Sequence, residues 1–339
     1  MDRAKLSSIS MPMPEATAGE AVAPGAPIDV AVLIPCRNEA ATIARVVRDF
    51  QAALADARIY VYDNGSSDLT GEAAAAAGAI VRREARRGKG EVLRRMFAEV
   101  EADAYVMVDG DATYDAQSVR RMLQVLTSTG CDMVTAVRDE GAQTAAYRRG
   151  HRLGNRLFNR LLGFLFGSQP TDMFSGYRVL ARRFVKSFPA ASTGFEIETE
   201  LTVHALQQRL PTAEIPTPYF ARPPESPSKL ATYRDGTRIL LATFLLFKDE
   251  RPLSFFSVLG VALALTGLVL GIDVVREFMR TGLVPRLPTA ILASGLMILS
   301  FLAFSCGLIL DSVARGRREL KRLAYLAVRA PSHDDVRDA

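Results

Sequence analysis

Short runs of apolar, often β-branched residues alternate with stretches of helical period from residue 29 onward. The strands and helices that this pattern predicts are Val30–Ile34, Glu39–Leu54, Ile59–Tyr62, Ser67–Ala77, Ala104–Val108, Ala116–Thr127 and Met133–Val137. Alternation of this kind is typical of an α/β fold with a parallel sheet. Ligands of such sheets bind at the carboxyl ends of the strands, so the polar residues after each strand are the candidates for chemistry.

Two long apolar segments near the C-terminus, Leu253–Val275 and Pro288–Leu310, follow a different pattern. The two segments together contain one charged residue, Asp273, near the end of the first. At about 1.5 Å per residue each crosses roughly 30 Å of hydrocarbon. Neither has a polar face, so buried helices of a soluble core are the less favoured interpretation. The flank after the second segment, from Arg315 to Arg329, is richer in Lys and Arg than the loop between the segments. This asymmetry predicts that both termini are cytoplasmic.

Basic and bulky apolar residues are interleaved over Tyr147–Phe166, which predicts a helix lying on an anionic membrane surface. Arg238–Lys248 predicts a second such element leading into the first apolar segment. An ordinary amphipathic surface helix is the alternative for Tyr147–Phe166. Residues 1–27 show neither the helical nor the strand period, and Glu15 and Glu20 interrupt their apolar stretches. We expect a disordered tail there and no signal peptide.

Composition agrees with one soluble domain joined to a small membrane part. Of the 339 residues, 49% are hydrophobic and 23% charged, and the formal net charge is +5. The three cysteines, Cys36, Cys131 and Cys306, are far apart and odd in number. They support neither a disulfide framework nor a zinc cluster, and the simplest setting for the chain is a reducing cytoplasmic face.

Acidic and amide residues follow three of the predicted strands. The first strand leads into Asn38-Glu39, the second into Asp63-Asn64, and a later one into Asp109-Gly110-Asp111. Two carboxylates at positions i and i+2 can share one hard divalent cation, and Mg²⁺ and Mn²⁺ prefer such oxygen ligands together with substrate phosphates. Two surface aspartates at a turn are the alternative. The position after a buried strand favours a Mg²⁺ or Mn²⁺ site.

In this order and context, Pro35-x-x-Asn38-Glu39, Asp63-Asn64-Gly65-Ser66-x-Asp68 and Asp109-Gly110-Asp111 resemble the family 2 glycosyltransferases of GT-A fold. The likeness is greatest to polyprenyl-phosphate glycosyltransferases of the dolichyl-phosphate mannose synthase type, over residues 29–250. It implies a domain order of a tail at 1–27, a GT-A domain at 28–232 with an interfacial helix at about 145–167, a linker at 233–251, two membrane helices at 252–311 and a basic cytoplasmic tail at 312–339.

The resemblance also implies roles for individual residues. The implied donor-binding residues are Pro35, Asn38, Glu39, Asp63, Lys89, Asp109, Asp111, Arg222 and Lys229. Asp109 and Asp111 are the implied metal ligands, and Lys89 as a solvated turn residue is the alternative to its donor contact. Two departures from the pattern, Thr113 in place of a Gln and Asn64 in place of a second Asp, predict a change in metal geometry or donor choice.

Acceptor recognition is assigned by the same resemblance to basic residues after the metal site. Arg138, Arg148 and Arg152 are the implied ligands of a lipid phosphate, a group that guanidinium can grip with two hydrogen bonds. The implied catalytic residues are Asp111, Arg138, Arg148 and Asp172, with a turn or helix cap as the alternative for Asp172. The acidic residues Glu196, Glu198 and Glu200 are attractive as general bases. A phosphate acceptor is already an anion, so they are expected either to support the structure or to orient arginines and sugar hydroxyls instead.

The function expected from the resemblance is inverting, metal-dependent transfer of a hexosyl unit from a nucleotide sugar to a polyprenyl phosphate. We expect a UDP-linked glucose or N-acetylhexosamine as donor, a site at the cytoplasmic face of the inner membrane, and no nucleic-acid partner. A homotetramer is plausible. The alternatives are transfer to a lipid hydroxyl, a GDP-mannose donor, and a degenerate homologue that tethers partners to the membrane. A processive polysaccharide synthase is disfavoured because the chain has no Trp.

Overall fold

The computed structural model describes residues 28–139, 171–194, 196–222, 247–249 and 251–328. All helices and strands named below belong to one compact unit, Asp29–Ala330. The predicted interfacial helix at about 145–167 lies outside the described residues, as do nearly all of the linker at 233–251 and the site residues Arg148, Arg152 and Lys229.

Seven strands in the described part of the chain form one sheet, in the order β3-β2-β1-β4-β6-β5-β7. Their bounds are β1 Val30–Cys36, β2 Arg58–Asp63, β3 Ile80–Arg83, β4 Ala104–Met107, β5 Met133–Asp139, β6 Arg178–Ala181 and β7 Thr212–Pro218. The β1, β2, β3 and β4 strands pair in parallel, as do β5 and β7. The prediction of a parallel sheet is wrong at β6, which is antiparallel to β4 and β5. The chain leaves β5 and enters β6 at the same edge of the sheet, so β6 has to run back.

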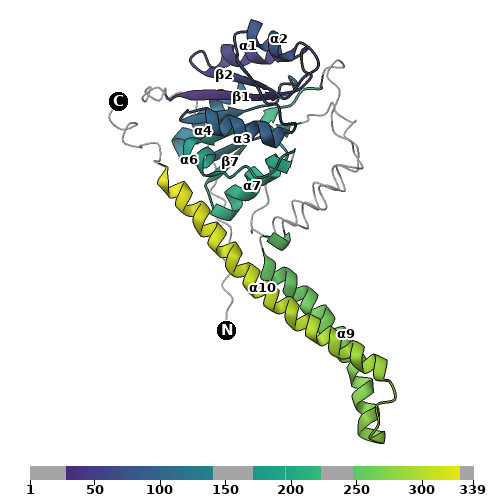
Figure 1. Cartoon of the computed structure of the whole chain (residues 1–339). Helices are drawn as coiled ribbons and strands as arrows, with labels where there is room; N and C mark the ends of the chain where they lie inside the picture. Colours follow the sequence, from purple (N-terminus) through teal and green to yellow (C-terminus); the bar gives the residue numbers. More distant parts are fainter. Residues whose placement is uncertain (1–27, 140–170, 195, 223–246, 250, 329–339) are drawn as a thin grey trace. The chain divides into compact units, whose positions relative to one another are not determined.

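Helices cover both faces of this sheet (Figure 1). Alternation along β1 divides the core, because Val32 and Ile34 point to one face and Ala31 and Leu33 to the other. The first face is covered by α1 Ile43–Ala53, α2 Thr70–Ala76 and α4 Ser118–Thr129, and the second by α3 Lys89–Glu99, α6 Arg182–Ser187 and α7 Glu196–Gln208. Two layers of helix therefore bury the strands and leave their ends open for chemistry.

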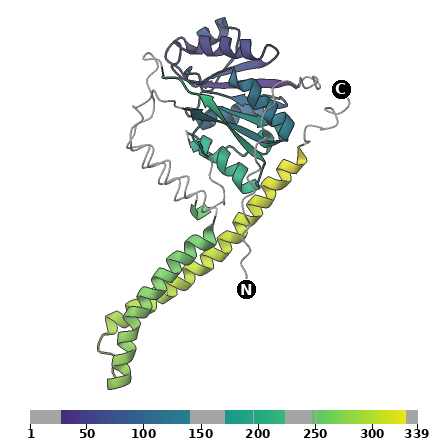
Figure 2. The same cartoon turned by 180° about the vertical axis from the view of Figure 1, so that it is seen from behind.

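The two apolar segments form the helices α9 Pro252–Thr281 and α10 Leu287–Ala327, each long and apolar enough to cross a membrane. They run side by side in both views (Figures 1 and 2). Ser300 on α10 donates a 2.7 Å hydrogen bond to the Gly260 carbonyl on α9. The missing side chain at Gly260 makes room for Phe304, whose ring would lie 2.9 Å from an added Cβ. Small residues thus let the two backbones approach, as in other membrane helix pairs.

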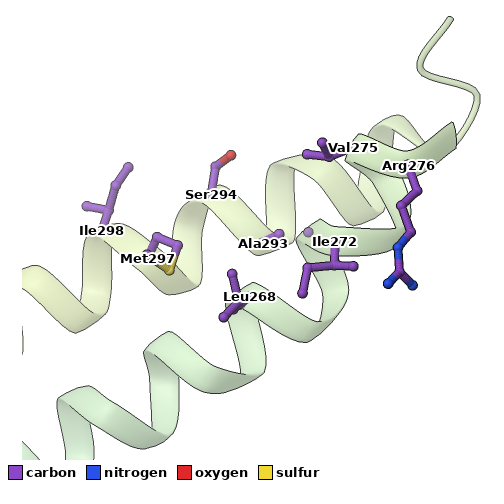
Figure 3. Close-up of a pocket in the computed structure, with 10 residues that line it drawn as sticks. Leu268, Ile272, Val275, Arg276, Ala293, Ser294, Met297 and Ile298 are labelled. Carbon is purple, nitrogen blue, oxygen red and sulfur yellow. The ribbon is translucent and has the colours of Figure 1, made fainter. Parts of the chain in front are cut away.

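A groove of about 640 Å³ lies along this helix pair (Figure 3). Leu268 and Ile272 of α9 and Ala293 and Met297 of α10 contribute to its lining, and Arg276 lies at one end. Its walls are mostly aliphatic. The groove therefore fits contact with hydrocarbon and not the polar chemistry expected after the strands.

The α10 helix continues well beyond the predicted span, into residues that the sequence analysis assigned to a basic tail. Its last turns pack on the sheet domain, where Tyr325 donates a 2.9 Å hydrogen bond to the fully buried Asp132. Arg183 of α6 pairs with the same carboxylate and lies 5.0 Å from the centre of the Tyr325 ring. One continuous helix therefore joins the apolar pair to the sheet domain.

A buried histidine on α7 predicts a pH-dependent stability. The His204 ring lies edge-on between Phe184 and Phe188, with ring centres 5.3 and 5.4 Å away. Burial, aided by the charge of Lys321, lowers the pKa of His204 to about 4. Between pH 6.5 and 4 the unfolded chain then binds a proton that the folded chain does not, so stability falls as the pH falls.

His204→Phe is expected to remove this contribution, which reaches about 2 kcal/mol at pH 5. The measurement is the thermal midpoint of detergent-solubilised protein at pH 7.5 and pH 5. The variant should lose fewer degrees than the wild type over this interval, while the carboxylates titrate equally in both proteins. An equal loss in both would contradict the assignment.

Candidate active site

The predicted site residues meet at one edge of the sheet because β1, β2 and β4 are parallel. Cys36 at the end of β1 lies beside Asp63 at the end of β2, and Leu33 of β1 lies beside Met107, two residues before Asp109. The β3 strand ends at the same edge and leads to Lys89. Four separate chain segments are thus brought to one place, as expected for the carboxyl edge of an α/β sheet.

Hydrogen bonds join the loops after β1 and β2. The Asn38 side-chain oxygen accepts a 2.8 Å hydrogen bond from the Ser67 amide, and the Ser66 hydroxyl accepts a 2.9 Å bond from the Asn38 amide. Asp63 accepts a 2.9 Å bond from the Ser66 amide. Asn38 and Asp63 therefore shape the two loops, and their contacts to a donor base stay a prediction.

Glu39 lies beneath the Asp-Gly-Asp turn. Its amide donates a 2.9 Å hydrogen bond to the Thr70 hydroxyl, and its side chain is buried. A Cβ at Gly110 would come within 2.5 Å of the Glu39 carboxylate, so a larger residue at the centre of the turn would displace the buried Glu39 side chain. Thr42 donates a 2.7 Å bond to the Gly110 carbonyl. The helix that follows β1 thus supports the turn that carries Asp109 and Asp111.

Each carboxylate of the Asp-Gly-Asp turn is paired with a cation from another segment. Lys89, at the start of α3, pairs with Asp109, and Arg222 pairs with Asp111. Asp111 also accepts a 2.6 Å hydrogen bond from the Thr113 hydroxyl. Thr113, which was predicted to alter the metal site, therefore orients one of its two carboxylates.

Lys89 contacts a second carboxylate that the sequence analysis did not connect with the metal site. Its ammonium lies 2.6 Å from Glu198, in the first turn of α7. Only 8% of the Lys89 side chain and 10% of the Glu198 side chain are exposed. Although burial opposes the charge, Asp109 and Glu198 raise the pKa of Lys89. Burial raises the pKa of Glu198 and Lys89 opposes that shift. The alternative of a solvated turn residue is wrong for Lys89.

Asn64 positions the loop that carries Lys89. Its side chain donates hydrogen bonds to the carbonyls of Glu84, at 3.2 Å, and Arg86, at 2.6 Å, and accepts a 2.7 Å bond from the Gly88 amide. An amide can donate and accept at once, whereas the carboxylate of a second Asp could only accept. This explains the departure from the family pattern at position 64.

Two carboxylates on a short turn are a suitable set of hard oxygen ligands for Mg²⁺ or Mn²⁺. Gly176 packs against Asp109, whose carboxyl carbon would lie 2.9 Å from an added Cβ. Among the described residues, no group of three or more His, Cys, Asp and Glu side chains could hold a metal. Asp109 and Asp111 therefore fit a metal whose remaining ligands come from a substrate, such as a diphosphate.

Arg138 and Asp172 form a bidentate ion pair beside this turn. The Nε atom of Arg138 lies 2.7 Å from Asp172 and its Nη2 atom 2.8 Å. The Arg138 guanidinium also lies 5.6 Å from the centre of the Tyr219 ring. Asp172 thus orients the Arg138 guanidinium. The catalytic role predicted for Asp172 stays a prediction.

The Ser175-Gly176-Tyr177-Arg178 segment stabilises the packing of β6 through the hydrogen bonds of Arg178. The Arg178 side chain is fully buried and donates to the carbonyls of Ser175, at 3.0 Å, and Met173, at 2.6 Å, and to the Thr202 hydroxyl, at 2.9 Å. Burial lowers the pKa of Arg178. The segment therefore holds β6 against α7, which carries Glu198.

The three glutamates of α7 have different surroundings. Glu200 accepts hydrogen bonds from the amides of Ala191 and Ser192, at 2.9 and 2.8 Å. Glu198 pairs with Lys89, so it orients a lysine where the sequence analysis expected arginines or sugar hydroxyls. Helical spacing on α7 was a signal that could have placed Glu198 and Thr202 on one face, but only the fold brings Lys89 to that face.

Comparison with known proteins gives the family. The model of the family described as glycosyl transferase family 2 matches residues 31–188. Glycosyltransferase AglJ of Haloferax volcanii is 34% identical over 303 residues, which cover 88% of this chain and 99% of that protein. The chain belongs to glycosyltransferase family 2. This transferase is also 30% identical over 254 residues to the low-salt glycan biosynthesis hexosyltransferase Agl6 of the same organism, with 71% of this chain and 61% of that protein covered.

Solved structures confirm the GT-A fold of the transferase. Glucosyl-3-phosphoglycerate synthase from Mycobacterium tuberculosis, in complex with Mn²⁺, UDP and glucosyl-3-phosphoglycerate, superimposes with a TM-score of 0.53 at 26% identity. The match covers 64% of this chain and 79% of that one. The Mn²⁺ and UDP of that complex support a divalent metal cofactor for this transferase.

The contact between α3 and the loop before α7 predicts the effect of a single methyl group. The Gly90 amide donates a 3.0 Å hydrogen bond to the Thr193 carbonyl, and a Cβ at Gly90 would lie 2.7 Å from the Ser192 carbonyl carbon. Backbone atoms on both sides leave no room to adjust. Gly90→Ala should therefore separate the Lys89 turn from that loop.

We expect Gly90→Ala to destabilise the folded state by about 1–3 kcal/mol, the usual range for overpacking, and to weaken UDP binding. Gly316→Ala is the control, because nothing lies within 4 Å of the added Cβ and alanine favours the helix. Thermal midpoints and UDP titrations of both variants test the expectation. Equal behaviour of the two variants would show that the predicted overlap is absent.

Proposed function

We propose that this transferase moves a hexosyl unit from a nucleoside diphosphate sugar to a polyprenyl phosphate at the cytoplasmic face of the membrane, with inversion at the anomeric carbon. The observation that carries the proposal is the pairing of Asp109 with Lys89 and of Asp111 with Arg222 at the carboxyl edge of the sheet. Two acids and two cations at one place suit a metal-bound diphosphate. The apolar helices α9 and α10 suit an acceptor that stays in the bilayer.

The donor half of the proposal rests on the charges of the turn. Asp109 and Asp111 would hold the metal, which when bound neutralises the charge of the leaving diphosphate. Lys89 contacts Asp109 and Arg222 contacts Asp111. The two cations would therefore lie beside the oxygens of a diphosphate that shares the metal with these carboxylates. The UDP in the glucosyl-3-phosphoglycerate synthase complex supports UDP-glucose or a UDP-N-acetylhexosamine as donor over GDP-mannose.

The acceptor half of the proposal rests on Arg138. Asp172 holds its guanidinium in one orientation, and Arg148 and Arg152 are proposed to complete the phosphate contact. A phosphate monoester near pH 7 needs no base to remove a proton, so attack requires only alignment of its oxygen behind the anomeric carbon. The pairing of Glu198 with Lys89 and of Glu200 with two amides supports a reaction without a glutamate base.

The decisive experiment follows radiolabel from UDP- and GDP-sugars into the organic phase with short polyprenyl phosphate and Mg²⁺ or Mn²⁺. Asp111→Asn should lower transfer at least about 100-fold, because a carboxylate that faces the leaving diphosphate loses its charge. Asp115→Asn is the matched control, since Asp115 follows the same strand and accepts its hydrogen bonds from the start of α4: from the Ser118 amide at 2.9 Å, the Ser118 hydroxyl at 2.6 Å and the Gln117 amide at 3.4 Å. Release of UDP without labelled polyprenyl phosphate would overturn the acceptor assignment and point to a lipid hydroxyl.

Arg138→Lys tests the phosphate contact. Lysine keeps the charge but cannot form the bidentate pair with Asp172, so the acceptor should be held less well. We expect the KM for polyprenyl phosphate to rise about tenfold, the effect of roughly 1.4 kcal/mol, with UDP affinity unchanged. Arg45→Lys, on an exposed helix surface, is the control and should have wild-type kinetics. A change in UDP affinity without a change in acceptor KM would move Arg138 to the donor side.

A further inference from the structure

One ammonium group serves two carboxylates at the metal site. The Lys89 ammonium contacts Asp109, an expected metal ligand, and lies 2.6 Å from Glu198. The three side chains come from the start of α3, the turn after β4 and the first turn of α7. Asp109 is the most open of the three, with 28% of its side chain exposed against 8% for Lys89 and 10% for Glu198. The Lys89–Glu198 contact is therefore the inner one and the Asp109 contact faces the ligand.

The Lys89–Asp109 contact and a metal at Asp109 compete for the same carboxylate. A divalent cation repels an ammonium on the same side chain, so Lys89 has to give up part of this contact when the metal binds. A lysine with no second partner would then either leave the site or stay paired with Asp109, and in the second case it would lower the affinity of the site for the metal. Glu198 lies behind Lys89 and offers a second, buried partner.

We infer that Glu198 is a positioning residue that holds Lys89 when the metal takes Asp109, so that the ammonium stays beside the diphosphate of the donor. The inference rests on the proposed nucleotide-sugar site and adds to it a residue of α7 that sets metal and donor affinity through Lys89. Arg178 supports the arrangement, since its hydrogen bond to Thr202 fixes α7 one turn after Glu198.

Two properties of the contacts favour this role over mere stabilisation of the fold. In the described residues, Glu198 makes an ion pair with Lys89 and with no other cation. Only 8% of the Lys89 side chain is exposed, so water cannot replace Asp109 as a partner of its ammonium, whereas Glu198 can. Glutamine at 198 would keep the shape and leave the Lys89 ammonium with Asp109 as its carboxylate partner.

The test measures Mn²⁺ binding to the full-length protein in detergent, by the loss of the free Mn²⁺ paramagnetic signal, with and without UDP. Glu198→Gln should weaken Mn²⁺ binding about tenfold, because Lys89 competes for Asp109 without its second partner. In steady-state transfer the KM for the donor should rise while kcat stays within about threefold, since phosphate oxygens draw Lys89 back once donor is bound. Glu101→Gln is the matched control, because Glu101 also pairs with a lysine, Lys186, but lies before β4, at the opposite end of that strand from the site. It should leave the Mn²⁺ affinity unchanged.

A double-mutant cycle separates action through Lys89 from a direct effect. In a Lys89→Met background, Glu198→Gln should no longer weaken Mn²⁺ binding, because the competing ammonium is gone. The inference is overturned if folded Glu198→Gln binds Mn²⁺ with wild-type affinity, or if its effect persists without Lys89. Failure of the wild type itself to bind Mn²⁺ and UDP would instead overturn the proposed function.

Discussion

The active site depends on the neutralisation of carboxylates that are held at the end of a buried strand. All four residues of β4 are buried, and Asp111, just beyond it, is almost fully buried as well. A carboxylate in such a place is costly unless it is paired. Arg222 and Lys89 supply the pairing, and each comes from a segment far away in the sequence. The same charges that stabilise the turn are those that a metal-bound diphosphate requires, so stability and function depend on one set of contacts.

Close backbone approach is the second requirement of the site. A Cβ at Gly110 would displace the Glu39 carboxylate, and one at Gly176 would displace the Asp109 carboxylate. Gly110 is the centre of the Asp-Gly-Asp motif that carried the family resemblance, and Gly176 belongs to the Ser175-Gly176-Tyr177-Arg178 segment beside it. Their physical meaning is therefore packing around the carboxylates, and not flexibility of the turn.

In the described part of the chain, the α10 helix joins the apolar helix pair to the sheet domain. The α10 helix runs from Leu287 to Ala327, and its Tyr325 reaches the buried Asp132 beside Arg183. Asp132 lies directly before β5, the strand that ends next to Arg138. The helix that follows the apolar segment thus contacts the same strand that carries the proposed acceptor-binding arginine. This is a physical link between the apolar helices and the proposed site.

Sequence alone determined the fold class, the family, the two apolar helices and the residues at the strand ends. These features are local: periodicity sets the strands and helices, and the Asp-Gly-Asp turn follows its strand directly. It did not determine the reversed direction of β6, the extension of α10 onto the domain, or the partners of the charged residues. Asn64 was a departure without an explanation until the fold placed it against the Lys89 loop, and Glu198 was one of three similar acids until α7 was packed beside α3. Pairings across about 20 to 110 residues, such as Lys89 with Asp109 and with Glu198, arise from the packing of distant segments, and no local pattern encodes which of several like charges will meet.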